Sequence, residues 1–183
     1  MDCEWSKRTS DFLKMTLAKD YTSVSYALRV EGELVAADAL GWQDQPQQIQ
    51  AEERCTYNVA SVSKIYCTAA VMVLVQRGLI DLDTPVVEYV PEFTMLDEDY
   101  KKITVRHLLN HASGLPGTQW KGFSVTALTE RDYDEEVLNY LANSHLKAKP
   151  GEYSVYCNDG FTLAEIVVAR VSGHRYSDFL REN

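Results

Sequence analysis

The sequence predicts a mixed α/β (α+β) fold in which a small antiparallel sheet precedes a mostly helical region. Three observations predict this class. Residues 23–41 read as two strands around a Glu-Gly turn, residues 65–75 are apolar on nearly every side, and roughly the last hundred residues carry helical periodicity. With 45% hydrophobic and 25% charged residues, the 183-residue chain has the composition of a folded protein, which rules out collagenous, low-complexity and disordered classes.

A helix and a β-hairpin are predicted at the N-terminal end. Residues 9–20 place apolar side chains among charged ones, as an amphipathic helix does, and Ser10 or Asp11 is the expected N-cap. In the hairpin that follows, Gly32 supplies the positive φ angle of a tight turn. The polar stretch Gln43–Gln50 contains a proline and lacks periodicity, which predicts a surface loop.

A helix that is buried on all sides is predicted at the centre of the molecule. Residues 65–75 have the required apolar character, and Gly78 is the expected C-terminal stop. A turn follows over residues 79–86. Four further helices are predicted at residues 103–110, 133–144, 161–172 and 177–182. The chain is therefore expected to divide into a sheet domain with its buried helix (residues 1–85) and a helical domain (residues 86–183).

Charge and hydropathy argue against two kinds of partner. The formal charge is -9, from 27 acidic against 18 basic residues, so the mean field repels nucleic acids and anionic lipids. The longest apolar run, residues 65–75, is shorter than the ~20 residues that span a bilayer. The polar N-terminus carries no signal-peptide pattern, which favours a cytoplasmic protein unless a secretion signal has been removed. We expect neither a nucleic-acid partner nor a membrane span.

The spacing of cysteines and histidines argues against disulfides and metal sites. The cysteines include no CxxC pair and indicate reduced thiols; they are Cys3, Cys55, Cys67 and Cys157. The histidines form no HExxH motif, and the pair His107 and His111 has no third ligand nearby. We therefore expect no metal ion and no other cofactor.

The segment Ala60–Lys64 carries the strongest chemical signal. Ser61 is expected at the start of the buried helix, where unpaired backbone N–H groups and the helix dipole favour developing negative charge. Lys64 lies on nearly the same face, and a neutral amine beside a hydroxyl can take its proton. In the alternative reading, Ser61 caps the helix and Lys64 is solvated. The buried helix favours a nucleophile, because a lysine there needs a polar pocket.

A second polar cluster lies within Pro150–Gly160. Here Tyr156 and Asn158 are two residues apart in an extended segment and so point to the same side. A phenol beside a lysine ammonium has a lowered pKa and can relay protons, and an asparagine amide can hold a substrate carbonyl. The alternative is a packed aromatic residue followed by an asparagine that caps a helix.

These segments resemble the serine β-lactamase and penicillin-binding-protein superfamily, in its class C β-lactamase, D-alanyl-D-alanine carboxypeptidase and esterase branch. Matching blocks occur in family order at residues 57–64, 74–86, 103–116 and 150–160. The resemblance implies a β-lactamase/transpeptidase-like fold and a small-molecule ester, peptide or β-lactam substrate. It also implies that Ser61 is acylated, that Lys64 and Tyr156 share the acid/base work, and that Asn158 orients the substrate.

Two segments that match family motifs are expected to have structural rather than catalytic roles. The block His111–Pro116 is shared with the family, but it reads as a helix end and turn beside the site, and His111 is not expected to act as a base. Residues 135–139 spell the Glu-x-x-Leu-Asn of class A β-lactamases. Their apolar members are already explained as the face of a helix.

The third motif of the family, a Lys- or His-led triplet ending in Gly on the strand facing the serine, is absent. The chain therefore resembles the N-terminal half of a serine hydrolase, and we expect a second polypeptide or self-association to complete its sheet. Loss of one oxyanion donor costs ~100- to 1,000-fold in rate, so the isolated half is expected to be nearly inactive. The alternative function is a non-catalytic relative that binds a ligand or assembles with another chain.

Overall fold

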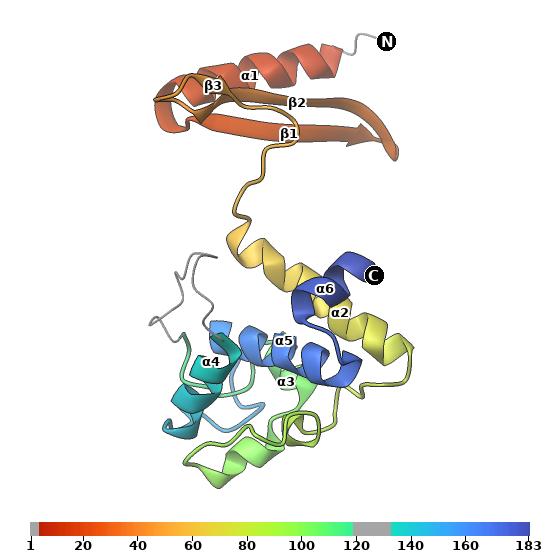
Figure 1. Cartoon of the computed structure of the whole chain (residues 1–183), viewed down its shortest axis with the longest axis vertical. Coiled ribbons are helices and arrows are strands. Elements are labelled where there is room, and N and C mark those ends of the chain that lie inside the picture. Colours follow the sequence, from red (N-terminus) through yellow and green to blue (C-terminus); the bar gives the residue numbers. More distant parts are fainter. Residues whose placement is uncertain (1–3, 119–132) are drawn as a thin grey trace. The chain divides into compact units, whose positions relative to one another are not determined.

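The structure is a computed structural model that describes residues 4–118 and 133–183 (Figure 1). Contacts group the chain into two compact units, Met1–Asn58 and Val59–Asn183. The first unit holds the sheet and the second holds most of the helices, so the mixed α/β class is confirmed. The expected division at residue 85 between a sheet domain and a helical domain stays a prediction.

The first unit combines one helix with an antiparallel sheet. Helix α1 (Glu4–Asp20) precedes strands β1 (Ser23–Val30), β2 (Glu33–Asp44) and β3 (Ile49–Gln50), and the order in the sheet is β1-β2-β3. The predicted hairpin is confirmed. Glu31 and Gly32 have positive φ angles of 53° and 87°, which suit the tight turns that match the twist of the flanking strands.

The predicted start of the first helix is wrong. Helix α1 begins at Glu4, not at a cap formed by Ser10 or Asp11. The additional turn places the Glu4 carboxylate at the positive end of the helix dipole and brings it within 3.8 Å of Arg8 one turn later. Both interactions favour helix in a segment that has no apolar periodicity.

The predicted loop at residues 43–50 is wrong in part, because strand pairing continues into it. Strand β2 extends to Asp44, and Trp42 pairs with Gln50 of β3. The turn between them closes locally, since the Asp44 carboxylate accepts a hydrogen bond of 3.0 Å from the Gln47 backbone N–H. This end of the sheet is largely solvent-exposed, so it has no alternation of apolar and polar residues by which the sequence could reveal it.

The second unit is built from helices. A 3₁₀ turn, η1 (Ala60–Val62), leads into α2 (Ser63–Gln76). The short 3₁₀ turns η2 (Val86–Glu88) and η3 (Glu98–Lys102) follow. The four further predicted helices are confirmed as α3 (Val105–Leu109), α4 (Tyr133–Ala142), α5 (Asn158–Ser172) and α6 (Tyr176–Glu182). The predicted stop of α2 is also confirmed, with Gly78 at a φ angle of 70° just beyond the cap residue Arg77.

Helix α5 forms the centre of the second unit. It contacts α2, α3, α4 and α6, as Figure 1 shows. Its buried apolar residues are Phe161, Leu163, Ala164, Ile166, Val167 and Val168. Burying a side chain such as Leu163 or Ile166 contributes roughly 1.5–3 kcal/mol, so α5 makes a large contribution to the stability of the unit. Its first residue, Asn158, belongs to the predicted site.

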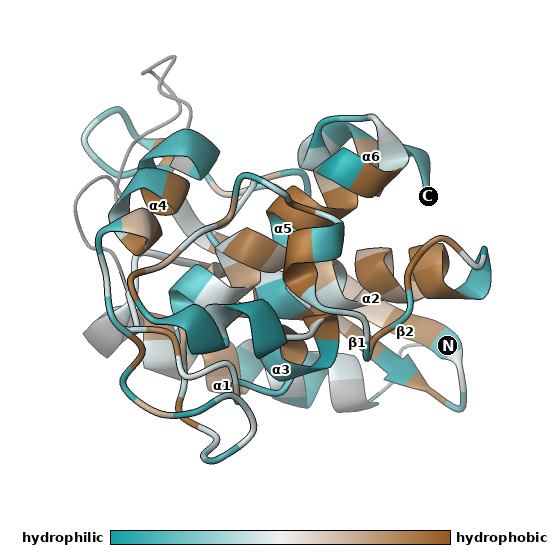
Figure 2. Ribbon diagram, turned by 90° about the horizontal axis from the view of Figure 1, so that it is seen from below, coloured by the Kyte–Doolittle hydropathy of each residue, from teal (hydrophilic) through white to brown (hydrophobic). Residues whose placement is uncertain are grey.

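Helix α2 is not buried on all sides, and that prediction is wrong. One face packs in the core through Cys67, Ala70, Val71 and Leu74. On the remaining surface Ile65 is 68% exposed. Figure 2 shows the hydrophobic character of the helix. Helices α5 and α6 pack against α2 and cover one of its faces. Burial on every side would need neighbours all round the helix.

No helix within residues 4–118 and 133–183 is both long enough and apolar enough to cross a membrane.

Candidate active site

Ser61 lies in the 3₁₀ turn that leads into α2. The turn is closed by a hydrogen bond of 3.0 Å from the Val62 N–H to the Val59 carbonyl. Ala60, directly before the serine, has a φ angle of 44°, in the left-handed region that costs an alanine about 1 kcal/mol. This unfavourable backbone places Ser61 on a bend ahead of the helix, where its side chain is exposed and can be reached by a substrate.

Lys64 is held between two predicted site residues. Its Nζ atom lies 3.3 Å from the Ser61 Oγ and donates a hydrogen bond of 2.7 Å to the Asn158 Oδ1. Its position on the first turn of α2, three residues after the serine, directs both side chains to one side of the helix. The side chain is half-buried and has polar partners, in contrast to the solvated lysine of the alternative reading.

The Tyr156 hydroxyl is hydrogen-bonded to the Ser61 Oγ across 95 positions of sequence. The Lys64 Nζ lies over the tyrosine ring, 4.7 Å from its centroid. Hydrogen bonding to Lys64, followed by hydrogen bonding to Ser61, lowers the pKa of Tyr156 below its ordinary value. The Tyr156 oxygen is therefore held against the serine oxygen, and its phenolate form is favoured relative to that of a free tyrosine.

Asn158 connects the lysine to a residue that sequence reasoning missed. It is the first residue of α5, and while its Oδ1 accepts from Lys64, its Nδ2 donates to the Thr118 Oγ1 at 2.9 Å. Thr118 lies 40 positions before Asn158, so no local spacing links the two residues. Its hydroxyl fixes which way the amide faces and thereby directs the Oδ1 toward the lysine.

His111 lies behind Tyr156. The two rings are 4.7 Å apart between centroids, and the His111 ring is 5.1 Å from that of Phe161. The His111 Nδ1 accepts a hydrogen bond of 3.1 Å from the Cys157 backbone N–H. Burial, followed by repulsion from the Lys64 ammonium, lowers the pKa of His111. The prediction that this residue is structural agrees with its contacts, which are with the tyrosine segment.

The structure buries the thiol of Cys157. Its Sγ donates to the Gly117 carbonyl at 3.1 Å, and burial raises the pKa of the thiol. Cys55, Cys67 and Cys157 are all free thiols. Within the described part of the chain, no group of three His, Cys, Asp or Glu side chains lies close enough to share a metal ion.

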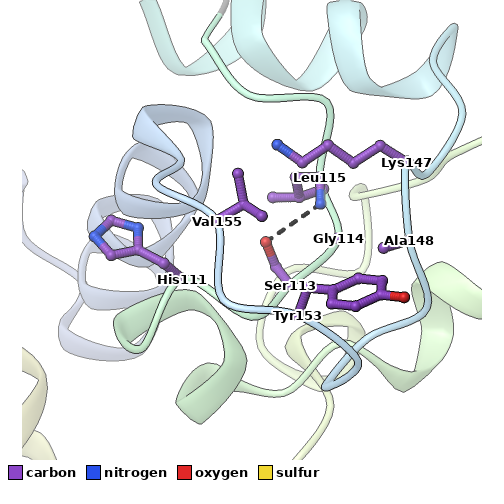
Figure 3. A pocket seen from close by; sticks show the side chains of 8 residues that line it. All are labelled: His111, Ser113, Gly114, Leu115, Lys147, Ala148, Tyr153 and Val155. Carbon is purple, nitrogen blue, oxygen red and sulfur yellow. Dashed lines mark hydrogen bonds between the residues drawn. The ribbon is translucent and has the colours of Figure 1, made fainter.

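A cavity of about 170 Å³ borders His111 (Figure 3). It lies between the turn after α3 and the segments that carry Tyr153 and Val155. One polar contact within its lining is the hydrogen bond of 3.4 Å from the Leu115 N–H to the Ser113 Oγ. The four predicted site residues do not line this cavity. The lining residues are His111, Ser113, Gly114, Leu115, Lys147, Ala148, Tyr153 and Val155.

The structure thus brings together all four side chains that the sequence nominated. Ser61 comes from the 3₁₀ turn η1 and Lys64 from the first turn of α2, and Tyr156 and Asn158 come from the segment that enters α5. Direct contacts join these two segments. The arrangement is that of a hydroxyl nucleophile with a phenol and an amine within reach.

Comparison with known proteins yields a consistent group of relatives. The family model for beta-lactamase matches residues 11–183. A penicillin-binding protein of Bacillus subtilis (strain 168) is 25% identical over 152 residues, which is 82% of this chain and 33% of that protein. The resemblance to the β-lactamase and penicillin-binding-protein superfamily is therefore confirmed.

Two solved structures show the same fold. EstCE1, a hydrolase with promiscuous acyltransferase activity, is 25% identical with a TM-score of 0.81, covering 99% of this chain and 50% of that one. The D-amino acid amidase from Ochrobactrum anthropi SV3 is 27% identical with a TM-score of 0.77, covering 94% of this chain and 46% of that one. The predicted β-lactamase/transpeptidase-like fold is confirmed, and the chain spans about half the length of each of these structures.

Proposed function

The chain belongs to the beta-lactamase family, and on that basis we propose that it acts through an acyl-enzyme formed on Ser61. One observation supports this most directly. The Ser61 hydroxyl is hydrogen-bonded to Tyr156, with the Lys64 Nζ 3.3 Å from the same oxygen. A nucleophile with a base in hydrogen-bond reach, and a third group that orients the base, is the usual arrangement for covalent catalysis.

The proposed acylation step moves one proton and exchanges one bond. Tyr156, as a phenolate, accepts the Ser61 proton while the Ser61 Oγ forms a bond to the substrate carbonyl carbon. The bond from that carbon to the leaving group then breaks, and the leaving group takes the proton from Tyr156. The Lys64 ammonium favours the phenolate, in agreement with the lowered pKa of Tyr156. Water then attacks the acyl-enzyme by the reverse proton route and restores Ser61.

Asn158 is proposed to orient the substrate. Its amide faces Lys64 on one side and Thr118 on the other, at 2.7 and 2.9 Å. An amide held at both ends presents its remaining hydrogen-bonding capacity in a fixed direction, which suits contact with a substrate carbonyl. The proposed substrates are small acyl compounds: esters, D-amino-acid peptides or amides, and β-lactams. A hydrolase with promiscuous acyltransferase activity and a D-amino acid amidase among the structural relatives support this class.

We also propose that a second polypeptide, or a second copy of the chain, completes the site and the sheet. Strand β1 pairs with β2 on one side only within the described residues, so its other edge is open to pairing. We propose the Ser61 backbone N–H as one oxyanion donor, and a second donor is worth ~100- to 1,000-fold in rate. The chain alone is therefore proposed to be acylated slowly.

Intact-mass spectrometry tests the nucleophile. The full chain is incubated with p-nitrophenyl acetate, and separately with benzylpenicillin, beside the variants Ser61→Ala and Ser63→Ala. We expect one acyl adduct on the wild type and on Ser63→Ala and none on Ser61→Ala, because Ser63 lies two residues away without a bond to Tyr156. Equal labelling of all three proteins would assign the adduct to another residue. No adduct with either reagent would favour the alternative function, a non-catalytic relative that binds ligand or assembles with another chain.

A further inference from the structure

We propose that His111 is a positioning residue that holds Tyr156 against Ser61 by accepting hydrogen bonds from the backbone on both sides of the tyrosine. The inference deepens the proposed function, since it concerns the proton acceptor of that same site. His111 has no part in the proton transfer itself. It determines where the phenol lies.

Two N–H groups that flank Tyr156 are both bound by His111. The Val155 N–H donates to the His111 carbonyl at 2.9 Å, and the Cys157 N–H donates to the His111 Nδ1 at 3.1 Å. The imidazole also packs against the Tyr156 ring, with 35° between the ring planes. One residue thus restrains the tyrosine backbone at both ends and the ring from one side. The segment otherwise lacks regular structure between residues 153 and 157.

His111 follows the C-cap of α3, where its N–H donates to the Leu108 carbonyl at 3.2 Å. Its φ angle is 61°, a left-handed conformation in which histidine and asparagine are enriched among residues other than glycine. Neighbours on both sides also bind the tyrosine segment. The Ser154 hydroxyl donates to the Asn110 carbonyl at 2.9 Å, and the Gly151 N–H donates to the Ala112 carbonyl at 2.8 Å. The end of α3 therefore serves as the support on which residues 151–157 are placed.

The side-chain bond requires one protonation state of the imidazole. An acceptor at Nδ1 implies the neutral ring with its proton on Nε2. Around the ring, the ionisable groups are the Lys64 ammonium from α2, the Tyr156 phenol and the buried Cys157 thiol, with Lys147 across the adjoining cavity (Figure 3). Burial and the Lys64 ammonium both favour the neutral ring. Protonation would place an Nδ1–H against the Cys157 N–H and break the contact.

Two substitutions test the side-chain acceptor. Both remove the imidazole ring, and only one of them leaves an acceptor in its place. His111→Asn keeps an acceptor oxygen near the Nδ1 position, and His111→Gly removes it. Both residues tolerate the positive φ angle, so backbone strain is matched. The readout is the pKa of Tyr156, followed by the ¹³Cζ resonance of labelled tyrosine and assigned with Tyr156→Phe. We expect the pKa to stay lowered in His111→Asn and to rise toward the ordinary ~10 in His111→Gly. Equal values in both variants would overturn the proposal.

A measurement on the unmodified chain tests the proposal even where a variant fails to fold. ¹⁵N spectra of labelled histidine should show the His111 Nδ1 unprotonated and Nε2 protonated at neutral pH. A proton on Nδ1 would overturn the proposal without any substitution. Neither readout needs catalysis, so absence of a Ser61 adduct would reject the proposed function and leave the positioning role standing. Where the adduct forms, acylation should slow about 10- to 100-fold in His111→Gly and little in His111→Asn.

Discussion

At the scale of single residues, Tyr156 and Lys64 have different relations to Ser61. The phenol is hydrogen-bonded directly to the serine oxygen, whereas the Lys64 Nζ is 3.3 Å away and forms its shorter bond, 2.7 Å, with Asn158. A general base must first reach the proton that it takes. This geometry supports the proposed role of Tyr156 as the proton acceptor and of Lys64 as the charge that lowers its pKa.

Replacement of Tyr156 by phenylalanine should therefore lower the acylation rate by about 100- to 10,000-fold, the usual range for a general base. The ring and its contact with His111 remain, so the fold should be retained. The rate is measured as adduct formation against time by mass spectrometry. The matched control is Tyr66→Phe, which removes a hydroxyl from a tyrosine that is 56% exposed on α2. A similar loss in both variants would contradict a specific role for Tyr156.

The pH dependence of acylation should report the charge on Lys64. In the proposed mechanism the phenolate is the active form, so the rate should rise with pH as Tyr156 loses its proton. Because Lys64 lowers the pKa of Tyr156, this rise should begin below the ordinary range of a tyrosine. In Lys64→Gln the rise should move to higher pH. A pH profile with an unmoved rise would show that another group titrates.

At the scale of elements, the turn after α3 is fitted closely to the segment that precedes Tyr156. Gly114 has a φ angle of 74°, and a Cβ atom there would lie 2.1 Å from the Ala148 carbonyl oxygen. The Lys147 N–H donates to the Gly114 carbonyl at 2.9 Å. Backbone meets backbone at this point, so neither side can yield as a flexible side chain would.

Gly114→Ala should therefore destabilise the chain by more than about 2 kcal/mol, since it combines left-handed strain with a backbone overlap. Gly78→Ala is the matched control. Its φ angle of 70° is nearly the same, but a Cβ atom there meets nothing within 4 Å, so only the strain of about 1 kcal/mol is expected. Urea unfolding followed by circular dichroism compares the two. An equal loss of stability would contradict the close fit.

At the scale of the whole molecule, the second unit contains a carboxyl group whose ionisation is unfavourable. Glu165 is half-buried on α5, the helix that contacts α2, α3, α4 and α6. Burial, followed by repulsion from Asp134, raises the pKa of its carboxyl from 4.5 to about 7. Lys64 opposes the shift from α2. The protonated carboxyl is therefore the form that suits the folded chain.

Stability should fall as pH rises through this range. Below about 4.5 the carboxyl is protonated whether the chain is folded or not, and its contribution is fully present. Between about 4.5 and about 7 only the folded chain keeps the proton, so the free energy of unfolding decreases with pH. Glu165→Gln should remove this part of the pH dependence, measured by urea unfolding at several pH values. Glu182→Gln on α6 is the control, and an identical effect of both substitutions would refute the assignment.

The sequence by itself determined the parts of this protein that depend on neighbours in the chain. The hairpin at Gly32, the stop of α2 at Gly78 and the later helices follow from turn chemistry and from periodicity, which act over a few residues. The family blocks likewise nominated Ser61 and Tyr156. Residues 43–50 escaped this reasoning, because an exposed strand end carries no periodic signal.

Only the tertiary structure decided which residues meet. The hydrogen bond between Ser61 and Tyr156 spans 95 positions. No spacing rule predicts the hydrogen bond of Asn158 with Thr118 or that of His111 with the Cys157 N–H. The same holds for α2, whose apolar sequence predicted burial on every side although its neighbours cover one face. Local propensity specifies elements, whereas burial and long-range hydrogen bonds depend on where the folded chain places their partners.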